Sequence, residues 1–265
     1  VLLIAGSERY LGAARLIGAA AARSGVGLVT VGVPAGLAPA IAASSMETMT
    51  YGIGPRDCVA FDFSCVDAAL NFSANLDAVG VGPGLSQEDG PAGFISDFLP
   101  RSSLPMVIDA DGLNCLSKQI EVLGRRTAPT ILTPHPGEMA RLAQMTTAEV
   151  QGDRGATARA FAMEHGCVVV LKGAGTVVAS PDGEVFTNTT GNSGMATGGT
   201  GDALTGLIAG LLAQGMDAVE AACAGVFVHG LAGDFAAEAM SERGMTALDL
   251  IAKIPMAWLR IEGKV

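Results

Sequence analysis

Charged residues are scarce in this chain of 265 residues, and basic residues are scarcer than acidic ones. Only 16% of the residues are charged, and 16 lysines and arginines stand against 26 acidic residues, a formal net charge of -10 at pH 7. A protein that binds nucleic acid or an anionic membrane through its surface needs a basic stripe. We therefore expect neither partner, and any anionic ligand must be held by local geometry.

Cysteine and histidine are few and widely spaced. The five cysteines are odd in number and include no C-x-x-C pair, so the sequence predicts neither a disulfide framework nor a structural zinc site. Three histidines are too dispersed for a dedicated histidine metal site. His165 and His229 fall in helical patterns and are expected to be structural. This cysteine usage indicates a reducing, cytoplasmic compartment.

Long apolar runs are also missing. Stretches such as Val168–Leu171 and Ala221–Val228 fall short of the roughly 20 residues that span a bilayer. Residues 1–5 are apolar but have no basic flank, unlike a signal peptide. We therefore expect no membrane association.

What the chain does contain is an alternation of short β-branched runs with alanine-rich helical patterns, which is typical of βαβ units. Its continuous apolar strands indicate a mostly parallel sheet covered by helices on both sides. Pro181-Asp182-Gly183 between two β-runs predicts an antiparallel hairpin near residues 177–187. We expect one domain over residues 1–265. The expected strands are 1–5, 28–33, 46–51, 78–81, 106–109, 130–133, 168–172, 177–179 and 184–187, and the expected helices are 12–24, 34–44, 91–99, 111–117, 138–144, 153–165, 200–214, 218–239 and 247–261.

A glycine-rich loop precedes the first of the three closing helices. Residues 191–202 read GNSGMATGGTGD. Glycines let the backbone approach a ligand, and the unpaired N–H groups of the helix start attract phosphate. The chain has neither a P-loop nor a Rossmann fingerprint. The loop therefore indicates a phosphate site of another kind, and the alternative is a simple capping loop with Asp202 as the cap.

Asp202 lies at the start of that helix, where the helix dipole stabilises its anion. We therefore expect its pKa to be low, which would make it a weak general base. Such a carboxylate still accepts a hydroxyl proton late in phosphoryl transfer, when that proton has become acidic. Its alternative role is that of an N-cap only.

Further loops follow predicted strands, and the carboxyl ends of parallel strands gather at one edge of a sheet. Residues 172–176, KGAGT, either contact a nucleotide or form a plain turn. Two prolines flank His135 and stiffen its backbone, which favours a ligand contact, while Glu138 also suits a helix cap. Asp109 and Asp111 either hold Mg²⁺ through water or act as turn and cap residues.

Together these motifs resemble the ADP/ATP-dependent NAD(P)H-hydrate dehydratase family. The resemblance implies a ribokinase-like three-layer αβα fold with a central, mostly parallel sheet. It also implies dehydration of NADHX and NADPHX, the hydrated forms of the reduced nicotinamide cofactors, with ADP or ATP as phosphoryl donor and with Mg²⁺. Bacterial members typically use ADP and assemble as homotetramers. The motifs are GAA from Gly12, GVGPGL from Gly80, DADGLN from Asp109, TPHPGE from Thr133, LKGAGT from Leu171 and GGTGD from Gly198.

The resemblance further implies a role for individual residues. Asp202 would be the catalytic base, and Glu138 falls where related sugar kinases have a glutamate that organises Mg²⁺. The residues implied to contact the hydrate are Ala14, Gly84, His135 and Asp202. Those implied to hold the nucleotide are Lys172, Gly173, Ala174, Gly175 and Thr176 at its AMP portion and Gly201 at its phosphates.

Two other functions remain open. A small-molecule hydroxyl kinase, such as a hydroxyethylthiazole or hydroxymethylpyrimidine kinase, shares the fold and the anion hole, although TPHPGE disfavours it. A non-catalytic nucleotide-sensing protein would keep every glycine loop, and the presence of Asp202 argues against it. The chain begins on its first strand without the glycine-containing lead-in of family members, so we expect further residues upstream.

Overall fold

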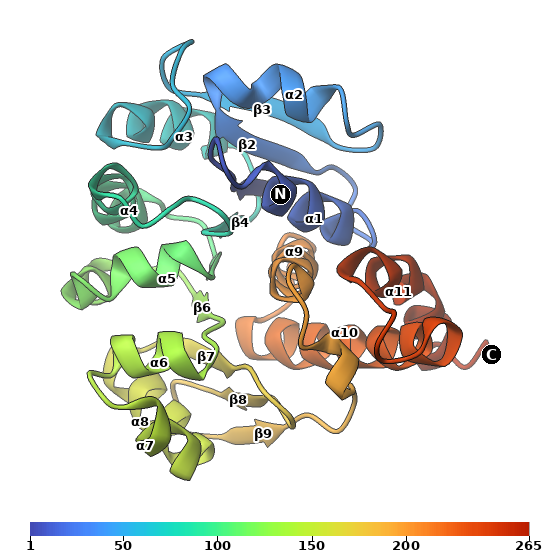
Figure 1. Ribbon diagram of the computed structural model, residues 1–265. Helices are drawn as coiled ribbons and strands as arrows, with labels where there is room; N and C mark the ends of the chain where they lie inside the picture. Colours follow the sequence, from blue (N-terminus) through green and yellow to red (C-terminus); the bar gives the residue numbers. More distant parts are fainter. Residues whose placement is uncertain (265) are drawn as a thin grey trace.

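A nine-stranded sheet forms the centre of the computed structural model, which describes residues 1–264 (Figure 1). The strand order is β3-β2-β1-β4-β5-β6-β7-β8-β9; neighbours are parallel as far as β7, and the last two pairs are antiparallel. The predicted parallel sheet with an antiparallel hairpin is confirmed. The strands are β1 (Leu2–Ile4), β2 (Thr30–Pro34), β3 (Met49–Ile53), β4 (Val79–Val81), β5 (Met106–Ile108), β6 (Thr130–Leu132), β7 (Val168–Leu171), β8 (Val177–Ala179) and β9 (Val185–Thr187).

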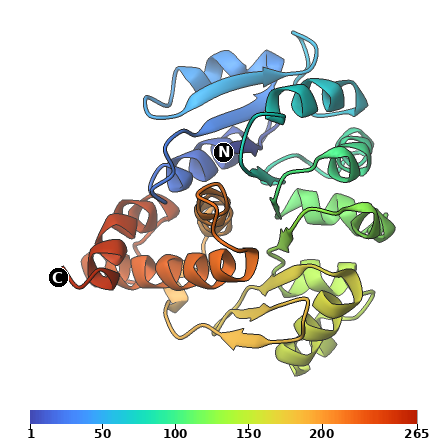
Figure 2. The same ribbon diagram turned by 180° about the vertical axis from the view of Figure 1, so that it is seen from behind.

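Helices cover both faces of the sheet and complete the three-layer αβα arrangement (Figures 1 and 2). One face has α1 (Leu11–Ala21), α2 (Ala38–Ala42), α9 (Thr200–Leu212), α10 (Ala218–Met240) and α11 (Ala247–Ile261). The other has α3 (Val66–Ser73), α4 (Asp89–Arg101), α5 (Asp111–Leu116), α6 (Pro136–Leu142), α7 (Thr147–Gly152) and α8 (Arg154–His165). Short 3-10 helices lie at Ala35–Leu37, Phe63–Cys65, Ile120–Arg125 and Ser193–Met195.

The strands are apolar at consecutive positions because they are buried from both sides. Leu2 and Ile4 of β1 pack into the core beneath α3 and α4, whereas Leu3 packs into the core beneath α1 and α9. All three are fully buried. A strand enclosed in this way needs an apolar side chain on each face, which is why its sequence does not alternate.

The structure departs from the predicted elements chiefly before residue 80. The helix expected over 34–44 is a 3-10 turn followed by the five-residue α2, and the third strand begins at Met49. Two helices, α3 and α7, were not predicted. Each has eight residues or fewer, so its helical periodicity covers too few turns to stand out in the sequence.

Within residues 1–264, α10 is the one helix whose length and composition would allow it to cross a membrane, with a mean hydropathy of 1.2. It packs against α9 and α11, and 56% of its most apolar stretch is buried inside the protein. A helix surrounded by protein on most sides needs this apolar composition for packing alone.

Helix α9 lies over the middle of the sheet, against β4 and β5, and packs closely on α1. A Cβ atom added at Gly206 of α9 would lie 2.2 Å from the carbonyl oxygen of Ile17, and one added at Gly210 would lie 2.0 Å from Ser24 Oγ. These glycines allow the two helices to touch through their backbones. The first turn of α9 is thereby fixed at the carboxyl edge of the sheet.

We predict that Gly206→Ala destabilises the protein by about 1–3 kcal/mol, because the new methyl group must push α9 away from α1. The measurement is the free energy of unfolding in urea. Gly93→Ala is the matched control, since this glycine of α4 has nothing within 4 Å of its added Cβ. That control should be stabilising by about 0.5–1 kcal/mol. Equal effects of the two substitutions would contradict the close packing.

Candidate functional site

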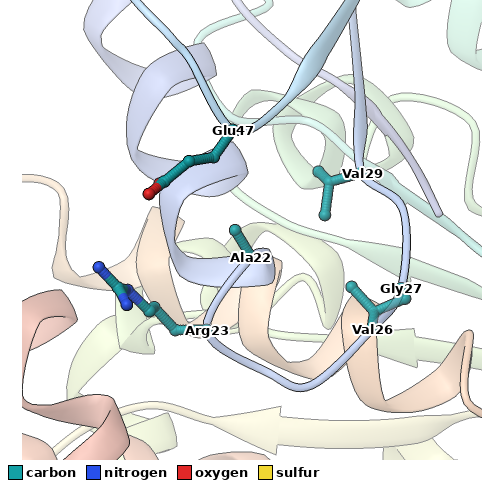
Figure 3. A pocket seen from close by; sticks show the side chains of 6 residues that line it. All are labelled: Ala22, Arg23, Val26, Gly27, Val29 and Glu47. Carbon is teal, nitrogen blue, oxygen red and sulfur yellow. The ribbon is translucent and has the colours of Figure 1, made fainter.

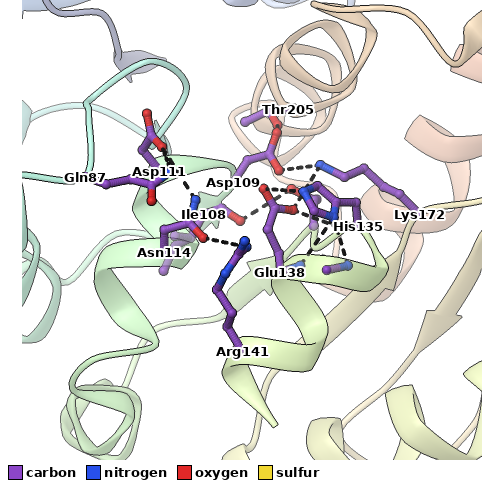
Figure 4. Close-up of polar contacts among 12 residues, drawn as sticks. Gln87, Ile108, Asp109, Asp111, Asn114, His135, Glu138, Arg141, Lys172 and Thr205 are labelled. Carbon is purple, nitrogen blue, oxygen red and sulfur yellow. Dashed lines mark hydrogen bonds and ion pairs between the residues drawn. The ribbon is translucent and has the colours of Figure 1, made fainter. Parts of the chain in front are cut away.

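Polar side chains follow the ends of three adjacent strands and lie at one edge of the sheet (Figure 4). Asp109 follows β5, His135 follows β6 and Lys172 follows β7. The start of α9 reaches the same place, because a Cβ added at Gly201 would lie 3.4 Å from Lys172 Nζ and 3.7 Å from Asp109 Oδ2. The structure therefore brings the predicted KGAGT, DADGLN, TPHPGE and GGTGD motifs together.

An ion pair lies at the centre of this cluster. Lys172 Nζ is 2.6 Å from Asp109 Oδ1 and 3.8 Å from Glu138 Oε2. The other Asp109 oxygen, Oδ2, accepts a hydrogen bond of 2.7 Å from Thr205 Oγ1 of α9. Asp109 is 1% exposed and Glu138 is 5% exposed, whereas the Lys172 side chain retains 20%. The two buried carboxylates thus share a single ammonium, whose side chain is partly exposed.

These surroundings shift the pKa of Glu138 and of Lys172. Burial raises the pKa of Glu138, and the Lys172 ammonium opposes that rise only in part. Burial alone would lower the pKa of Lys172, but Asp109 and Glu138 outweigh it and raise the pKa above its ordinary value. Lys172 is therefore a permanent cation at neutral pH.

The expectation of a low pKa for Asp202 is wrong. Burial, together with the nearby carboxylates of Asp109, Asp111 and Glu138, raises its pKa to about 7 against the opposing effect of Lys172. Desolvation and like charge therefore outweigh the dipole of α9. Asp202 is also not the cap of this helix: Gly199, with φ of 92°, occupies that position, and Asp202 lies in the first turn.

His135 and Glu138 form a reciprocal cap at the start of α6. The His135 Nδ1 atom accepts hydrogen bonds from the backbone N–H groups of Gly137 and Glu138, while Glu138 Oε2 accepts one of 2.7 Å from the His135 N–H. The capping interpretation of Glu138 is confirmed. Burial, with Lys172 and Arg141, lowers the pKa of His135. The imidazole is therefore neutral, as an Nδ1 acceptor must be.

Asp111 fixes the loop that follows β4. Its Oδ2 accepts a hydrogen bond of 2.9 Å from the Ser86 N–H, and its Oδ1 accepts one of 3.1 Å from Gln87 Nε2. The cap interpretation of Asp111 is wrong: Ala110 is the N-cap of α5 without a side-chain cap bond, and the Asp111 carboxylate holds a distant loop instead. Ala110, between the two aspartates, has φ of 51°, a left-handed conformation that costs a non-glycine residue free energy. That strain directs Asp109 and Asp111 to different partners.

Residues 173–175 are held by a residue that no sequence motif marked. The Arg154 guanidinium donates hydrogen bonds to the carbonyl groups of Ala174 and Gly175. A Cβ added at Gly173, where φ is 151°, would lie 2.1 Å from the same guanidinium. The loop is thus an ordered platform, and its two glycines have positive φ values of 151° and 62° that favour glycine.

The two remaining positions in the predicted substrate set are Gly84, in the loop after β4, and Ala14, in helix α1. Ser7 Oγ donates a hydrogen bond of 2.8 Å to the Gly84 carbonyl, and a Cβ at Gly84 would lie 2.7 Å from Tyr10 Cβ. Ala14 is fully buried in α1, with its methyl group under Gly6. Their contact with substrate stays a prediction.

His229 holds the start of α9 from within the protein, and its predicted structural role is confirmed. This residue of α10 is buried, and its Nε2 lies 2.8 Å from the Thr200 carbonyl at the first residue of α9. Burial lowers the pKa of His229 to about 4. The neutral ring therefore orders the helix start without adding charge there.

No cage for a metal is built from protein side chains alone, since residues 1–264 contain no group of three or more His, Cys, Asp or Glu side chains arranged to bind one. Mg²⁺, however, is commonly held by one or two carboxylates together with the phosphates of a nucleotide. Glu138, Asp109 and Asp202 surround one ammonium and leave negative charge uncompensated. These residues fit a cation that arrives with phosphate ligands.

A separate hollow of about 260 Å³ lies beside the end of α1 and the start of β2 (Figure 3). Val29, directly before β2, places it near the amino end of that strand, away from the loops that hold Lys172 and Asp109. It is not the site assembled above. Its lining residues are Ala22, Arg23, Val26, Gly27, Val29 and Glu47.

Comparison with known proteins agrees with these motifs. A model of the NAD(P)H-hydrate dehydratase family matches residues 1–256. The chain belongs to this family. It is similar to the bifunctional NAD(P)H-hydrate repair enzyme Nnr of Moorella thermoacetica, at 43% identity over all of this chain and 50% of that protein. The chain thus spans about half the length of this relative.

Two further relatives match nearly end to end. The ADP-dependent (S)-NAD(P)H-hydrate dehydratase of Xanthomonas campestris pv. campestris is 36% identical over 96% of this chain and 86% of that protein. The ADP/ATP-dependent NAD(P)H-hydrate dehydratase of Bacillus subtilis, co-crystallised with ATP and Mg²⁺, has a TM-score of 0.80 and 32% identity, covering 98% of this chain and 88% of that one. The ribokinase-like fold is confirmed.

We predict that His135→Ala lowers the free energy of unfolding by about 0.5–2 kcal/mol, because it removes the side-chain acceptor that caps α6. His135→Asn should remain within about 0.5 kcal/mol of the wild type, since asparagine is among the best capping residues. Urea denaturation at pH 8 measures both. Equal losses in the two variants would refute the capping role.

A second prediction concerns Asp202 and pH. Its folded pKa of about 7 lies above the ordinary 3.8, so its stabilising contribution is present at low pH and is lost as pH rises through 7. Asp202→Asn should therefore gain about 1–2 kcal/mol over the wild type between pH 5 and pH 8, after a discount for partial exposure. Urea unfolding of both proteins at each pH measures the difference. A gap that narrows with rising pH would contradict the raised pKa.

Proposed function

We propose that this chain dehydrates the hydrates of reduced nicotinamide cofactors, (S)-NADHX and (S)-NADPHX, back to NADH and NADPH, with ADP or ATP as the phosphoryl donor. Its membership of the dehydratase family and the match to ADP-dependent relatives support this reaction. We further propose that residues 1–265 form one dehydratase domain.

The reaction combines a phosphoryl transfer with an elimination. The hydroxyl oxygen of the hydrate attacks the terminal phosphorus of the nucleotide, and the bond from phosphorus to the leaving AMP or ADP oxygen breaks. The new phosphate ester then leaves as inorganic phosphate with the electrons of its C–O bond, while the neighbouring ring carbon loses a proton and the double bond reforms. The protein must bind two anionic ligands in line and accept a proton.

The observation that supports this proposal best is the position and pKa of Asp202. Its carboxylate lies in the first turn of α9, beside the Lys172–Asp109 pair, at the predicted phosphate-binding loop. A pKa of about 7 suits a general base at neutral pH, because the group is substantially ionised yet basic enough to take the proton. Asp202 is thus a stronger base than its helix position alone predicts.

Around this base we assign two ligand regions. The hydrate would contact Ala14, Gly84, His135 and Asp202, and the nucleotide would contact Gly201 and the platform of residues 172–176. The exposed half of the neutral His135 ring supports a ligand contact beside its capping role. The platform held by Arg154 presents backbone groups to the AMP portion.

We include Mg²⁺ as the accompanying cofactor, with Glu138 on the metal side. When bound, Mg²⁺ would neutralise the negative charge of the nucleotide phosphates. It would also neutralise the carboxylates at this site that have no cationic partner. We also propose a cytoplasmic homo-oligomer. The free cysteines support a cytoplasmic location. Exposed apolar side chains such as Leu28, Met46 and Phe63 support a subunit interface.

The experiment that tests the function supplies the purified protein with NADHX, Mg²⁺ and either ADP or ATP, and follows recovery of NADH absorbance. We expect recovery with at least one donor and release of AMP and phosphate when ADP is used. A stable phosphorylated hydrate without NADH would indicate a kinase. No nucleotide turnover would favour a sensing protein.

We predict that Asp202→Asn lowers kcat by about 10²–10⁴-fold, the usual contribution of a general base, while AMP affinity stays close to that of the wild type. Asparagine keeps the size of the side chain but cannot take the proton. The NADH recovery assay and calorimetric AMP titration give the two values. Wild-type rates in this variant would remove Asp202 from its proposed role.

A further inference from the structure

We propose that the Lys172 ammonium contacts the phosphoryl group being transferred, and that Asp109 and Thr205 are positioning residues that aim it there. This inference rests on the proposed function and deepens it. It separates Lys172 from the rest of the KGAGT loop, whose backbone we assign to the AMP portion.

The first step of the argument is the free capacity of the ammonium. A lysine ammonium has three N–H donors, and within residues 1–264 Lys172 donates one hydrogen bond, to Asp109 Oδ1. Glu138 Oε2, at 3.8 Å, is beyond hydrogen-bond distance. With 20% of its side chain exposed, Lys172 has donors left for a ligand that enters from outside.

The second step is where those donors lie. Gly201, in the first turn of α9, lies close enough to Lys172 Nζ that an added Cβ would be 3.4 Å away. The ammonium therefore shares its space with the unpaired N–H groups that begin α9. The free donors of the ammonium and the N–H groups of the helix start lie side by side, and both kinds of donor suit the oxygens of one phosphoryl group.

The third step concerns what holds Lys172 in that position. Asp109 binds Lys172 through one oxygen and Thr205 through the other, at 2.6 and 2.7 Å. Thr205 belongs to α9, one turn after Gly201, so the threonine hydroxyl sets the orientation of Asp109 relative to the helix. Strand β5, strand β7 and α9 are thereby aligned around a single carboxylate.

In the proposed step the ammonium hydrogen-bonds to the non-bridging oxygens of the phosphoryl group. A bond forms from the hydrate oxygen to phosphorus, the bond to the leaving nucleotide oxygen breaks with its electrons on that oxygen, and the hydroxyl proton passes to Asp202. Lys172 transfers no proton. The ammonium stabilises negative charge on the phosphoryl group during its transfer, as cationic side chains do in other phosphoryl transfers.

The test compares ADP with AMP, which lacks the transferable phosphoryl group. Removing the Lys172 charge alone would leave Asp109 buried and unpaired, so the variant is the double substitution Lys172→Met with Asp109→Asn, which keeps a partner for Thr205. Calorimetric titrations with excess Mg²⁺ give the affinities. We expect ADP affinity to fall about 10–100-fold and AMP affinity to change less than about twofold.

Lys253→Met is the matched control, because it removes a lysine charge in α11 away from the site. It should leave both affinities at wild-type values. Equal losses of ADP and AMP in the double variant would assign Lys172 to the AMP portion and overturn the proposal. Unchanged ADP affinity would overturn it as well.

Thr205 provides an independent test of positioning. Thr205→Val keeps the shape of the side chain but removes the hydrogen bond to Asp109, and we expect a roughly tenfold loss of the ADP-over-AMP preference with an unchanged KM for the hydrate. Thr205→Ser should restore the preference. A preference that survives in Thr205→Val would refute the positioning role, even if thermal stability falls.

These titrations also distinguish the inference from the proposed function. A wild type that binds ADP more tightly than AMP but recovers no NADH would reject the dehydratase reaction. The ADP and AMP affinities of the double variant would then still decide whether Lys172 contacts the phosphoryl group. A wild type that recovers NADH, with a double variant that keeps its ADP preference, would reject only the inference. A wild type that binds neither nucleotide would reject both.

Discussion

The buried contact between Asp109 and Lys172 is the interaction on which the rest of the site depends. It joins the end of β5 to the end of β7, and Thr205 extends it to α9. A buried ion pair is costly to form unless its remaining lone pairs and protons find partners. Here the fold provides these partners. The parallel strands end at one edge of the sheet, where their following residues place polar side chains, and the close packing of α9 on α1 brings a helix start to the same point.

The charge balance around that contact explains how one site can serve two anionic ligands. Asp109 and Glu138 share the one ammonium of Lys172, and burial together with this excess of negative charge raises the pKa of Asp202 to about 7. The same excess favours a divalent cation, which the phosphates of a nucleotide would bring with them. Positive potential at the start of α9 and negative potential on the Glu138 side therefore lie next to each other, as the opposing charges of a metal–nucleotide complex require.

Much of the architecture could be predicted from the sequence because it depends on local patterns. Continuous apolar runs such as Val168–Leu171 and the turn at residues 181–183 require only nearest neighbours, and the glycine-rich loop before Asp202 marks its own helix start. The raised pKa of Asp202 could not be predicted from the sequence. The helix dipole is a local effect, whereas the burial of Asp202 and the carboxylates that face it come from distant segments. Thr205 as a partner of Asp109, 96 residues away, leaves no pattern in sequence either.

The packing of α9 on α1 also sets the order in which the molecule can become functional during synthesis. Asp109, Lys172 and the loop of residues 172–176 all precede residue 177, but Asp202 and Thr205 belong to Thr200–Leu212, which packs on Leu11–Ala21. A nascent chain that has emerged only as far as the β8–β9 hairpin therefore has the Lys172–Asp109 pair but lacks Asp202 and the hydrogen bond from Thr205 to Asp109. A ligand that contacts both the start of α9 and the earlier loops would therefore stabilise the chain in which α9 has docked.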